Sequence, residues 1–298
     1  MKRLFFVMNP CAGTRKANKV LVEILSVFNK AGYEVIIHMT ETQGDAKKVV
    51  AQRAMDMDLV VCCGGDGTFN ETVSGLLASG ADIPIGYIPA GSTNDFANSL
   101  KLPTDPLAAA KLIVDGQPRE FDLGRFGNRF FSYVASFGAF TRVSYTTPQS
   151  VKNTLGHTAY VLSSIQELSQ IRTIPVRLSV DGQRIEDEFI FGAICNSTSV
   201  GGILALDPNQ VDLCDGKFEL LLVRAPRDLA EIGECILAVQ RQQYNCKMMR
   251  FFSGSDIRIE IDPNIPWTLD GEQAEGSNLI EVENLHKAYK LITQAETV

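Results

Sequence analysis

The sequence predicts an α/β domain built on a parallel sheet, followed by a second domain that is mainly a β-sandwich. Over the first hundred residues, short apolar runs alternate with amphipathic stretches. From about residue 119 the pattern changes to extended stretches separated by turn pairs. The chain has 298 residues, 45% of them hydrophobic and 21% charged, which is ordinary for one large or two medium globular domains. We place the domain boundary near residue 130.

Four strand-helix units in succession predict a parallel, Rossmann-like sheet with helices on both faces. The expected strands are continuous apolar runs, typical of strands covered on both faces, at 4–8, 35–39, 59–63 and 85–88. The first expected helix ends at Gly32, and its apolar face is formed by Val20, Leu21, Ile24, Leu25 and Phe28. Further helices are expected at 45–55, at 69–77 and from residue 94.

The second half of the chain contains the signals of β-hairpins. Gly127-Asn128 and Asp181-Gly182 each separate two extended stretches, as hairpin turns do. Further strands are expected at 218–223, 257–261, 267–269 and 279–282, with helices near 158–170 and 227–242. We expect the functional site in the cleft between the two domains.

Charge and composition exclude several classes of protein. With 28 Lys and Arg against 35 Asp and Glu, the net charge is −7, so a nucleic-acid partner is not expected. The seven cysteines lie mostly in apolar runs without a CxxC spacing or a secretory leader, which predicts free thiols in the reducing cytoplasm. No apolar run approaches the roughly 20 residues that a membrane span needs. The three scattered histidines form neither a local zinc motif nor a catalytic triad.

The strongest motif is CCGGDGTFNET, residues 62–72. A buried strand ends there and a helix begins at about Phe69, so glycine backbone and free N–H groups predict an anion site. The alternative is a tight turn with a capping box formed by Thr68 and Glu71, but this leaves Asp66 unexplained. A carboxylate in a phosphate loop repels phosphate unless a divalent cation lies between them. Asp66 is therefore predicted to reach Mg²⁺, directly or through water.

Two further motifs carry acidic residues. IPAGSTNDFANSL, residues 88–100, also follows a strand, and its alternative interpretation is a helix start with Ser92 as N-cap and Asp95 in the first turn. In WTLDGEQ, residues 267–273, Asp270-Gly271 suits a hairpin turn, but no turn requires the second carboxylate, Glu272.

The chain contains GGDGT, then PAGSTNDFA about twenty-five residues later, and DGE near the end. Together these motifs resemble the diacylglycerol kinase catalytic-domain family. This family includes soluble bacterial diacylglycerol kinases and the sphingosine and ceramide kinases. GGDGT alone is shared with NAD kinases, whereas the combination with GSTNDFA is specific to the lipid-kinase branch. The resemblance implies a first domain of the NAD-kinase/diacylglycerol-kinase type. It implies that 1–130 binds nucleotide, completed by about 286–298, and that 131–285 is the sandwich that accepts the lipid.

The resemblance also implies site residues, with ATP and Mg²⁺ as cofactors. The positions that match the family's ATP site are Asn9, Pro10, Cys11, Ala12, Gly13, Thr40, Gly65, Asp66, Gly67, Thr68, Phe69, Asn70, Glu71 and Ser92. Glu272 would be the general base, and Asp66 and Asp95 would complete the acidic active site. A structural Mg²⁺ site matches VDLCDGKFE, with the side chains of Asp212 and Asp215 and the carbonyl of Lys217 as ligands. Asp215-Gly216 also suits a hairpin turn.

The implied reaction transfers the γ-phosphate of ATP to the hydroxyl of diacylglycerol and gives phosphatidic acid. A lipid substrate requires peripheral docking on a membrane from the cytoplasm, through basic and apolar surface. Candidate surfaces are Arg15, Lys16 and Lys19, and residues 246–252, which also fit an ordinary core segment. A homodimer is what the bacterial family suggests. The alternatives are kinases of another lipid alcohol, such as a sphingoid base or phosphatidylglycerol, a soluble-acceptor kinase such as NAD kinase, and a catalytically silent regulator.

Overall fold

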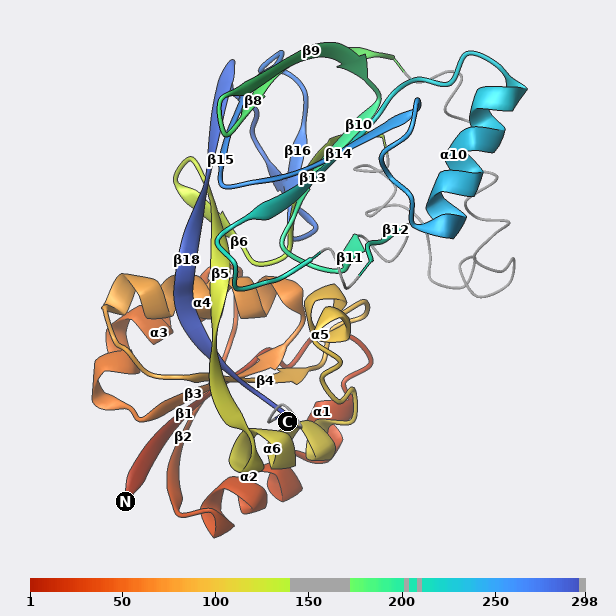
Figure 1. The fold of residues 1–298 in the computed structure, drawn as a ribbon. Helices are drawn as coiled ribbons and strands as arrows, with labels where there is room; N and C mark the ends of the chain where they lie inside the picture. The colour runs from red at the N-terminus through yellow and green to blue at the C-terminus, as the bar shows by residue number, and fades with distance from the viewer. Residues whose placement is uncertain (140–171, 201–203, 208–210, 295–298) are drawn as a thin grey trace. The chain divides into compact units, whose positions relative to one another are not determined.

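A computed structural model describes residues 1–139, 172–200, 204–207 and 211–294, and the helix expected at 158–170 lies outside them. The chain divides into two compact units (Figure 1). The N-terminal unit comprises Met1–Leu123 and His286–Val298, and the C-terminal unit comprises Gly124–Leu285. The first is a mixed α/β unit with a mostly parallel sheet and the second is an antiparallel β unit, so the predicted fold class is confirmed.

The sheet of the N-terminal unit has the strand order β2-β1-β3-β4, and all of these pairs are parallel. Its strands lie within two residues of the predicted positions: β1 (Lys2–Met8), β2 (Tyr33–Met39), β3 (Leu59–Gly64) and β4 (Ile85–Pro89). β1, β3 and β4 are apolar along most of their length because helices cover them, and Phe6, Val61 and Ile88 are fully buried.

The helices of this unit differ from the expectation at several ends. They are α1 (Lys16–Lys19), α2 (Leu21–Lys30), α3 (Asp45–Arg53) with the 3₁₀ turn η1 (Ala54–Asp56), α4 (Asp66–Ser79), α5 (Asp95–Ser99) and α6 (Pro106–Asp115). The expected start of a helix at Phe69 is wrong, because α4 begins three residues earlier at Asp66. Sequence patterns did not anticipate α6, which Asp105 caps by accepting a hydrogen bond from the Ala108 N–H.

Two strands, β5 (Gln117–Phe126) and β18 (Leu279–Thr293), contribute residues to both units. β18 is much longer than the predicted 279–282. Its first residues pair with β15, and Leu291 pairs in parallel with Ile85 of β4. The fully buried Asp122 of β5 accepts hydrogen bonds from the His286 ring, at 2.9 Å from Nδ1, and from the Lys287 N–H. These contacts hold the returning C-terminal segment against the N-terminal unit.

The C-terminal unit has two antiparallel layers. One contains β5 with β6 (Arg129–Phe131), and β18 with β15 (Asp256–Glu260), β8 (Ile174–Val180) and β9 (Gln183–Phe189). The other has the order β14-β13-β10-β7-β16-β17, with bounds β14 (Met249–Gly254), β13 (Phe218–Val223), β10 (Phe191–Cys195), β7 (Val134–Gly138), β16 (Trp267–Leu269) and β17 (Glu272–Ala274).

Smaller elements complete the C-terminal unit. They are the pair β11 (Ser199–Val200) and β12 (Leu204–Ala205), and the helix α10 (Leu229–Arg241). A single apolar core includes residues of both layers, among them Phe137, Phe218, Ile259 and Trp267. Among the described residues, no helix combines the length and apolar character that crossing a bilayer requires.

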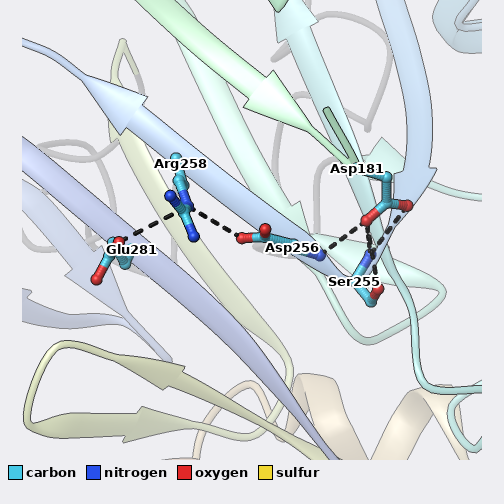
Figure 2. A network of polar contacts seen from close by, with 5 residues as sticks. All are labelled: Asp181, Ser255, Asp256, Arg258 and Glu281. Carbon is cyan, nitrogen blue, oxygen red and sulfur yellow. Dashed lines mark hydrogen bonds and ion pairs between the residues drawn. The ribbon is translucent and has the colours of Figure 1, made fainter. Parts of the chain in front are cut away.

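The predicted Asp181-Gly182 hairpin is confirmed, and its aspartate also binds neighbouring backbone (Figure 2). Both turn residues have positive φ, 49° and 84°, as a two-residue hairpin turn requires. The Asp181 carboxylate accepts hydrogen bonds from the Ser255 and Asp256 N–H groups at 3.1 and 2.9 Å. Arg258 lies between the carboxylates of Asp256 and Glu281, which joins β15 to β18 (Figure 2).

Asp181→Asn should lower stability in a pH-dependent way. Hydrogen bonds from Asp256 and Ser255 hold the pKa of Asp181 below its ordinary value of 3.8. The carboxylate therefore stabilises the folded chain above that pH, and its contribution is lost as the pH falls through the lowered value. We expect Asp181→Asn to reduce the free energy of unfolding at neutral pH by about 1 kcal/mol. The difference from wild type should shrink in strong acid. Urea unfolding at both pH values tests this, and a difference independent of pH would contradict it.

Candidate functional site

Three loops of the N-terminal unit meet at one edge of its parallel sheet. They follow β1, β3 and β4, and carboxyl ends of parallel strands lie at the same edge. The Asn9 N–H donates to the Cys63 carbonyl at 2.9 Å, and the Ala90 N–H donates to the Gly64 carbonyl at 2.8 Å. Thr40, after β2, donates its N–H to the Met8 carbonyl at 2.8 Å. The structure thus brings the NPCAG, GGDGT and AGSTND segments together.

Glycines allow the loops to approach this closely. A Cβ on Gly91 would lie 2.6 Å from the Cα of Gly65 and 2.7 Å from the Asn94 Oδ1. Gly13 has a positive φ of 47°, and a Cβ there would lie 2.4 Å from the Ala90 carbonyl oxygen. Side chains at these positions would separate the loops, so the backbone itself forms the surface here.

Asp66 joins the second loop to the third. It is the first residue of α4, and its carboxylate accepts hydrogen bonds from the N–H groups of Asp95 and Phe96 at 3.2 and 3.4 Å. These groups belong to the first turn of α5, whose N-terminus favours a negative charge. Helix capping is therefore a role of Asp66 that the sequence interpretation lacked. A carboxylate is also a common ligand of Mg²⁺.

The alternative capping box is wrong. Thr68 is inside α4, and its hydroxyl accepts a hydrogen bond from the Asn9 side chain at 3.3 Å. The carboxylate of Glu71 leaves its own helix and accepts from the N–H groups of Gly44 and Ala46, at 2.7 and 3.2 Å. Glu71 therefore caps α3. Local spacing could not reveal this, because Gly44 is 27 residues away.

The third loop is ordered by Asn94. Its side-chain amide bonds to both the N–H and the carbonyl of Gly91, at 2.8 and 3.0 Å, and its φ is positive. Asn94 is also the N-cap position of α5, so the alternative interpretation with Ser92 as N-cap is wrong, whereas Asp95 does lie in the first turn of the helix. Asp95 is buried, with 4% of its surface exposed, at the start of the same helix. The Asp66 carboxylate thus lies beside the backbone of Asp95, and the acidic site formed by the two residues stays a prediction.

Glu272 belongs to the C-terminal unit, where it begins β17. Its carboxylate lies 3.5 Å from the guanidinium of Arg129, and about a third of its side chain is exposed. The preceding turn is the predicted Asp270-Gly271 hairpin turn, with φ values of 50° and 84°. An accessible carboxylate on a short, ordered hairpin is suited to taking a proton.

The predicted metal ligands lie in turns of the same unit. Asp212 Oδ1 accepts from the Cys214 N–H at 3.0 Å, and Asp215 Oδ1 accepts from the Lys217 N–H at 2.9 Å. The Lys217 carbonyl accepts a hydrogen bond from the Asn284 side chain. Within the ranges that the structure describes, no group of three His, Cys, Asp or Glu side chains converges as a complete metal site. A cation here would therefore need the carbonyl and water as additional ligands.

Glu219 is an acidic residue that the sequence interpretation missed. It is 1% exposed, and its Oε1 lies 3.4 Å from the Ser253 hydroxyl. Among the described residues, its Oε2 has no hydrogen-bond partner. Burial, and then the charges of Asp215 and Asp212, raise the pKa of Glu219 to about 8. The charges of the two aspartates thus add to the cost of ionising the buried Glu219 carboxyl group. Glu219 interrupts the otherwise continuous apolar run of β13, whose six residues are all buried, and this position could have indicated a buried acid.

Residues 246–252 are only partly buried: Phe252 packs against the apolar core of the unit, and Lys247 is exposed. Met248 and Met249 are buried, which agrees with the core interpretation rather than with apolar membrane contact. Lys247 lies 2.8 Å from Glu231, and Arg250 lies 3.7 Å from Asp187. Both basic side chains are paired with carboxylates.

Comparisons with known proteins agree with both units. Residues 3–126 match the model of the diacylglycerol kinase catalytic domain, and residues 134–291 match that of the YegS C-terminal NAD kinase beta sandwich-like domain. The chain is 32% identical over 274 residues to the diacylglycerol kinase of Bacillus subtilis, covering 91% of this chain and 90% of the relative. A diacylglycerol kinase of Staphylococcus epidermidis is 33% identical over 272 residues, covering 88% and 85%.

Solved structures share the fold along the whole chain. A Bacillus anthracis protein described as a candidate diacylglycerol kinase matches with a TM-score of 0.80 and 26% identity, over 100% of this chain and 96% of the other. A second crystal structure from B. anthracis, described as a diacylglycerol kinase, has a TM-score of 0.77 at 24% identity, over 100% and 98%.

Gly91→Ala should separate the second and third loops. The added methyl would overlap Gly65 and Asn94, so we expect a loss of about 1–3 kcal/mol in the free energy of unfolding. Nucleotide affinity should fall at least about tenfold, because the backbone can no longer approach phosphate closely. Calorimetric titration with ATP and thermal unfolding measure the two effects.

Gly233→Ala is the matched control. A Cβ at Gly233, inside α10, meets nothing within 4 Å, so this variant should bind ATP as the wild type does. Unchanged ATP affinity in Gly91→Ala would show that the close approach of the loops is not needed for nucleotide binding.

Proposed function

Because the chain belongs to the diacylglycerol kinase catalytic-domain family, and is a kinase of that family, we propose that it phosphorylates diacylglycerol with ATP and forms phosphatidic acid. The observation that carries this proposal is the contact of Asp66 with the first turn of α5. It joins GGDGT to GSTNDFA, the motif combination of the lipid-kinase branch. The similarity to named diacylglycerol kinases along about nine-tenths of the chain supports the acceptor.

In this proposal ATP lies against the edge where the three loops meet. The backbone of residues 9–13 and 65–71 would hold the phosphates, together with Thr40 and Ser92. α4 contributes the positive end of its dipole, and the glycines give the phosphates room to approach. Phosphoryl transfer depends mainly on positioning and charge neutralisation, so a Walker lysine is not required.

Asp66 and Asp95 fit a Mg²⁺ ion that accompanies the nucleotide. Mg²⁺ is commonly held by one or two carboxylates together with substrate phosphates and water, and these two residues provide that donor set. Bound there, the ion would neutralise charge on the phosphates. The helix α5 keeps Asp66 in place whether or not the ion is bound.

We assign the general base to Glu272. An aliphatic hydroxyl hardly ionises at neutral pH, so a carboxylate that takes its proton as the bond to phosphorus forms accelerates transfer by about 10²–10⁴-fold. Glu272 has the chemistry and the exposure for this step. The proposal requires it to reach the acceptor hydroxyl in the substrate complex.

Glu272→Gln should retain the fold and ATP binding and lose turnover. We expect kcat to fall by at least about 10²-fold, because the amide cannot accept the proton. The measurement is transfer of labelled phosphate from ATP, with Mg²⁺, to diacylglycerol in mixed micelles with an anionic lipid. Glu275→Gln, an exposed neighbour in the same hairpin region, is the matched control and should keep wild-type turnover.

The same assay separates the acceptors. Label in phosphatidic acid supports the proposal, whereas label in NADP from a parallel reaction with NAD would overturn it in favour of a soluble-acceptor kinase. Label only in a sphingoid base or phosphatidylglycerol would place the chain among the other lipid kinases. ATP binding without transfer to any acceptor would support a silent regulator.

We also propose a structural Mg²⁺ ion at Asp212, Asp215 and the Lys217 carbonyl. The supporting observation is the buried Glu219 Oε2, which has no hydrogen-bond partner among the described residues. The negative charges of both aspartates also disfavour the ionised form of Glu219. A divalent cation would offset this concentration of negative charge.

Mg²⁺ should raise the melting temperature of the nucleotide-free wild type, because an ion that binds only the folded state stabilises it by about 2.7 kcal/mol at a hundred times its Kd. Asp215→Asn should abolish most of this response. In the control Asp262→Asn, which accepts an equivalent hydrogen bond from the N–H two residues on, the response should remain. An unchanged Mg²⁺ response in Asp215→Asn would exclude this site.

Peripheral membrane association and a homodimer remain parts of the proposal. A diacylglycerol substrate lies in a bilayer, so the chain must dock on it transiently. The exposed basic residues Arg15, Lys16 and Lys19 are suited to anionic headgroups.

A further inference from the structure

The buried carboxylate of Asp270 holds the hairpin that carries Glu272. Its two oxygens accept hydrogen bonds from three consecutive backbone N–H groups, those of Ser132, Tyr133 and Val134, at 2.6, 3.0 and 3.0 Å. The Asp270 N–H returns a hydrogen bond to the Val134 carbonyl at 2.9 Å. Only 6% of Asp270 is exposed. These four hydrogen bonds therefore fix the turn to residues 132–134, which lead from β6 into the first residue of β7.

This anchor lies two residues before Glu272. Leu269 pairs with Glu272 across the two-residue turn, so the position of Asp270 determines where β17 begins. The fully buried Trp267 fixes the other end of β16 in the core. Little freedom is left for the backbone of Glu272.

A second contact acts on the side chain of Glu272. Arg129, in β6, lies 3.5 Å from the Glu272 carboxylate and donates a hydrogen bond to the Gln273 carbonyl at 2.7 Å. Because one guanidinium binds both the side chain and the adjacent backbone, it restricts the rotation of Glu272.

We propose that Asp270 and Arg129 are positioning residues for Glu272: Asp270 fixes its backbone through the β6–β7 segment, and Arg129 orients its carboxylate toward the acceptor hydroxyl. This inference rests on the proposed function, in which Glu272 is the base. A hairpin turn alone does not need a buried carboxylate that accepts three backbone hydrogen bonds. A base must instead lie within hydrogen-bond reach of its proton, and a displacement of about 1 Å can cost 10²-fold in rate.

The test compares Asp270→Asn with Asp181→Asn. Both aspartates occupy the first position of an Asp-Gly hairpin turn and accept bonds from neighbouring backbone N–H groups, but only the hairpin of Asp270 carries Glu272. In Asp270→Asn an NH₂ group replaces one of the two carboxylate oxygens. This group is a hydrogen-bond donor, so it would face the backbone N–H donors of residues 132–134 and could not accept from them. We expect kcat to fall roughly 10²-fold with the KM for ATP within about threefold of wild type, and Asp181→Asn to keep wild-type kcat.

A double-mutant cycle separates positioning from general destabilisation. If Asp270 acts through Glu272, Asp270→Asn should add less than about a threefold loss in a Glu272→Gln background, because coupled residues are not additive. Equal losses of kcat in both backgrounds, or wild-type kcat in Asp270→Asn while Glu272→Gln is inactive, would overturn the inference. Wild-type turnover in Glu272→Gln would instead refute the assigned base.

Arg129→Gln tests the same proposal without a buried change. Its side chain is 40% exposed, so the variant should fold even where Asp270→Asn does not. We expect kcat to fall about tenfold with ATP binding unchanged, since the Glu272 carboxylate loses the guanidinium that orients it. Wild-type kcat in folded Arg129→Gln would overturn the orienting role.

Discussion

The hydrogen bonds from Asp95 and Phe96 to the Asp66 carboxylate are the contacts on which the proposed phosphate site depends. They join two motifs that lie about thirty residues apart in the chain, and they place the Asp66 carboxylate beside the first turn of α5. The short α5 has only five residues and could not be stable by itself. Its N-terminus is stabilised by a side chain from α4, so the two loops form one structural unit.

Carboxylates that accept backbone N–H groups recur throughout the molecule. Glu71 caps α3, Asp181 binds the β14–β15 connection, Asp122 holds β18, and Asp270 binds the β6–β7 segment. Each satisfies donors that the local secondary structure leaves unpaired, and each joins segments distant in sequence. These contacts give several acidic residues of the motifs a structural role.

Glu219 differs from these carboxylates because its burial is not compensated in the same way. One of its oxygens has no hydrogen-bond partner in the part of the chain that the structure describes, and the nearby Asp212 and Asp215 add like charge. Proteins usually neutralise such a buried acid by protonation or by a cation. This local imbalance links the antiparallel unit to the proposed structural ion, although the aspartates themselves are occupied by their own turns.

Local sequence patterns determined much of the fold. Apolar runs located β1, β3 and β4 because these strands are buried along most of their length, whereas β2, at the sheet edge, is partly exposed. Gly-Asn and Asp-Gly pairs located hairpin turns because only a few residues adopt positive φ readily. The motif combination also identified the family, which the full-length relatives confirm. The start of α4 was misplaced by three residues, since Gly65 and Asp66 suited both a loop and a helix start.

Only the tertiary structure decided which hydrogen-bond partners the motif residues have. The capping of α3 by Glu71, the capping of α5 by Asp66 and the anchoring of Asp270 to residues 132–134 all join positions 25 to 138 residues apart. Spacing rules describe neighbours on one helix or one hairpin, so they cannot name these partners. Spacing rules also could not predict the length of β18. Its later residues lack strand-like alternation and are held by pairing with other strands. The sequence by itself thus determined which residue types gather in the motifs, and long-range backbone hydrogen bonding decided what each of them holds in place.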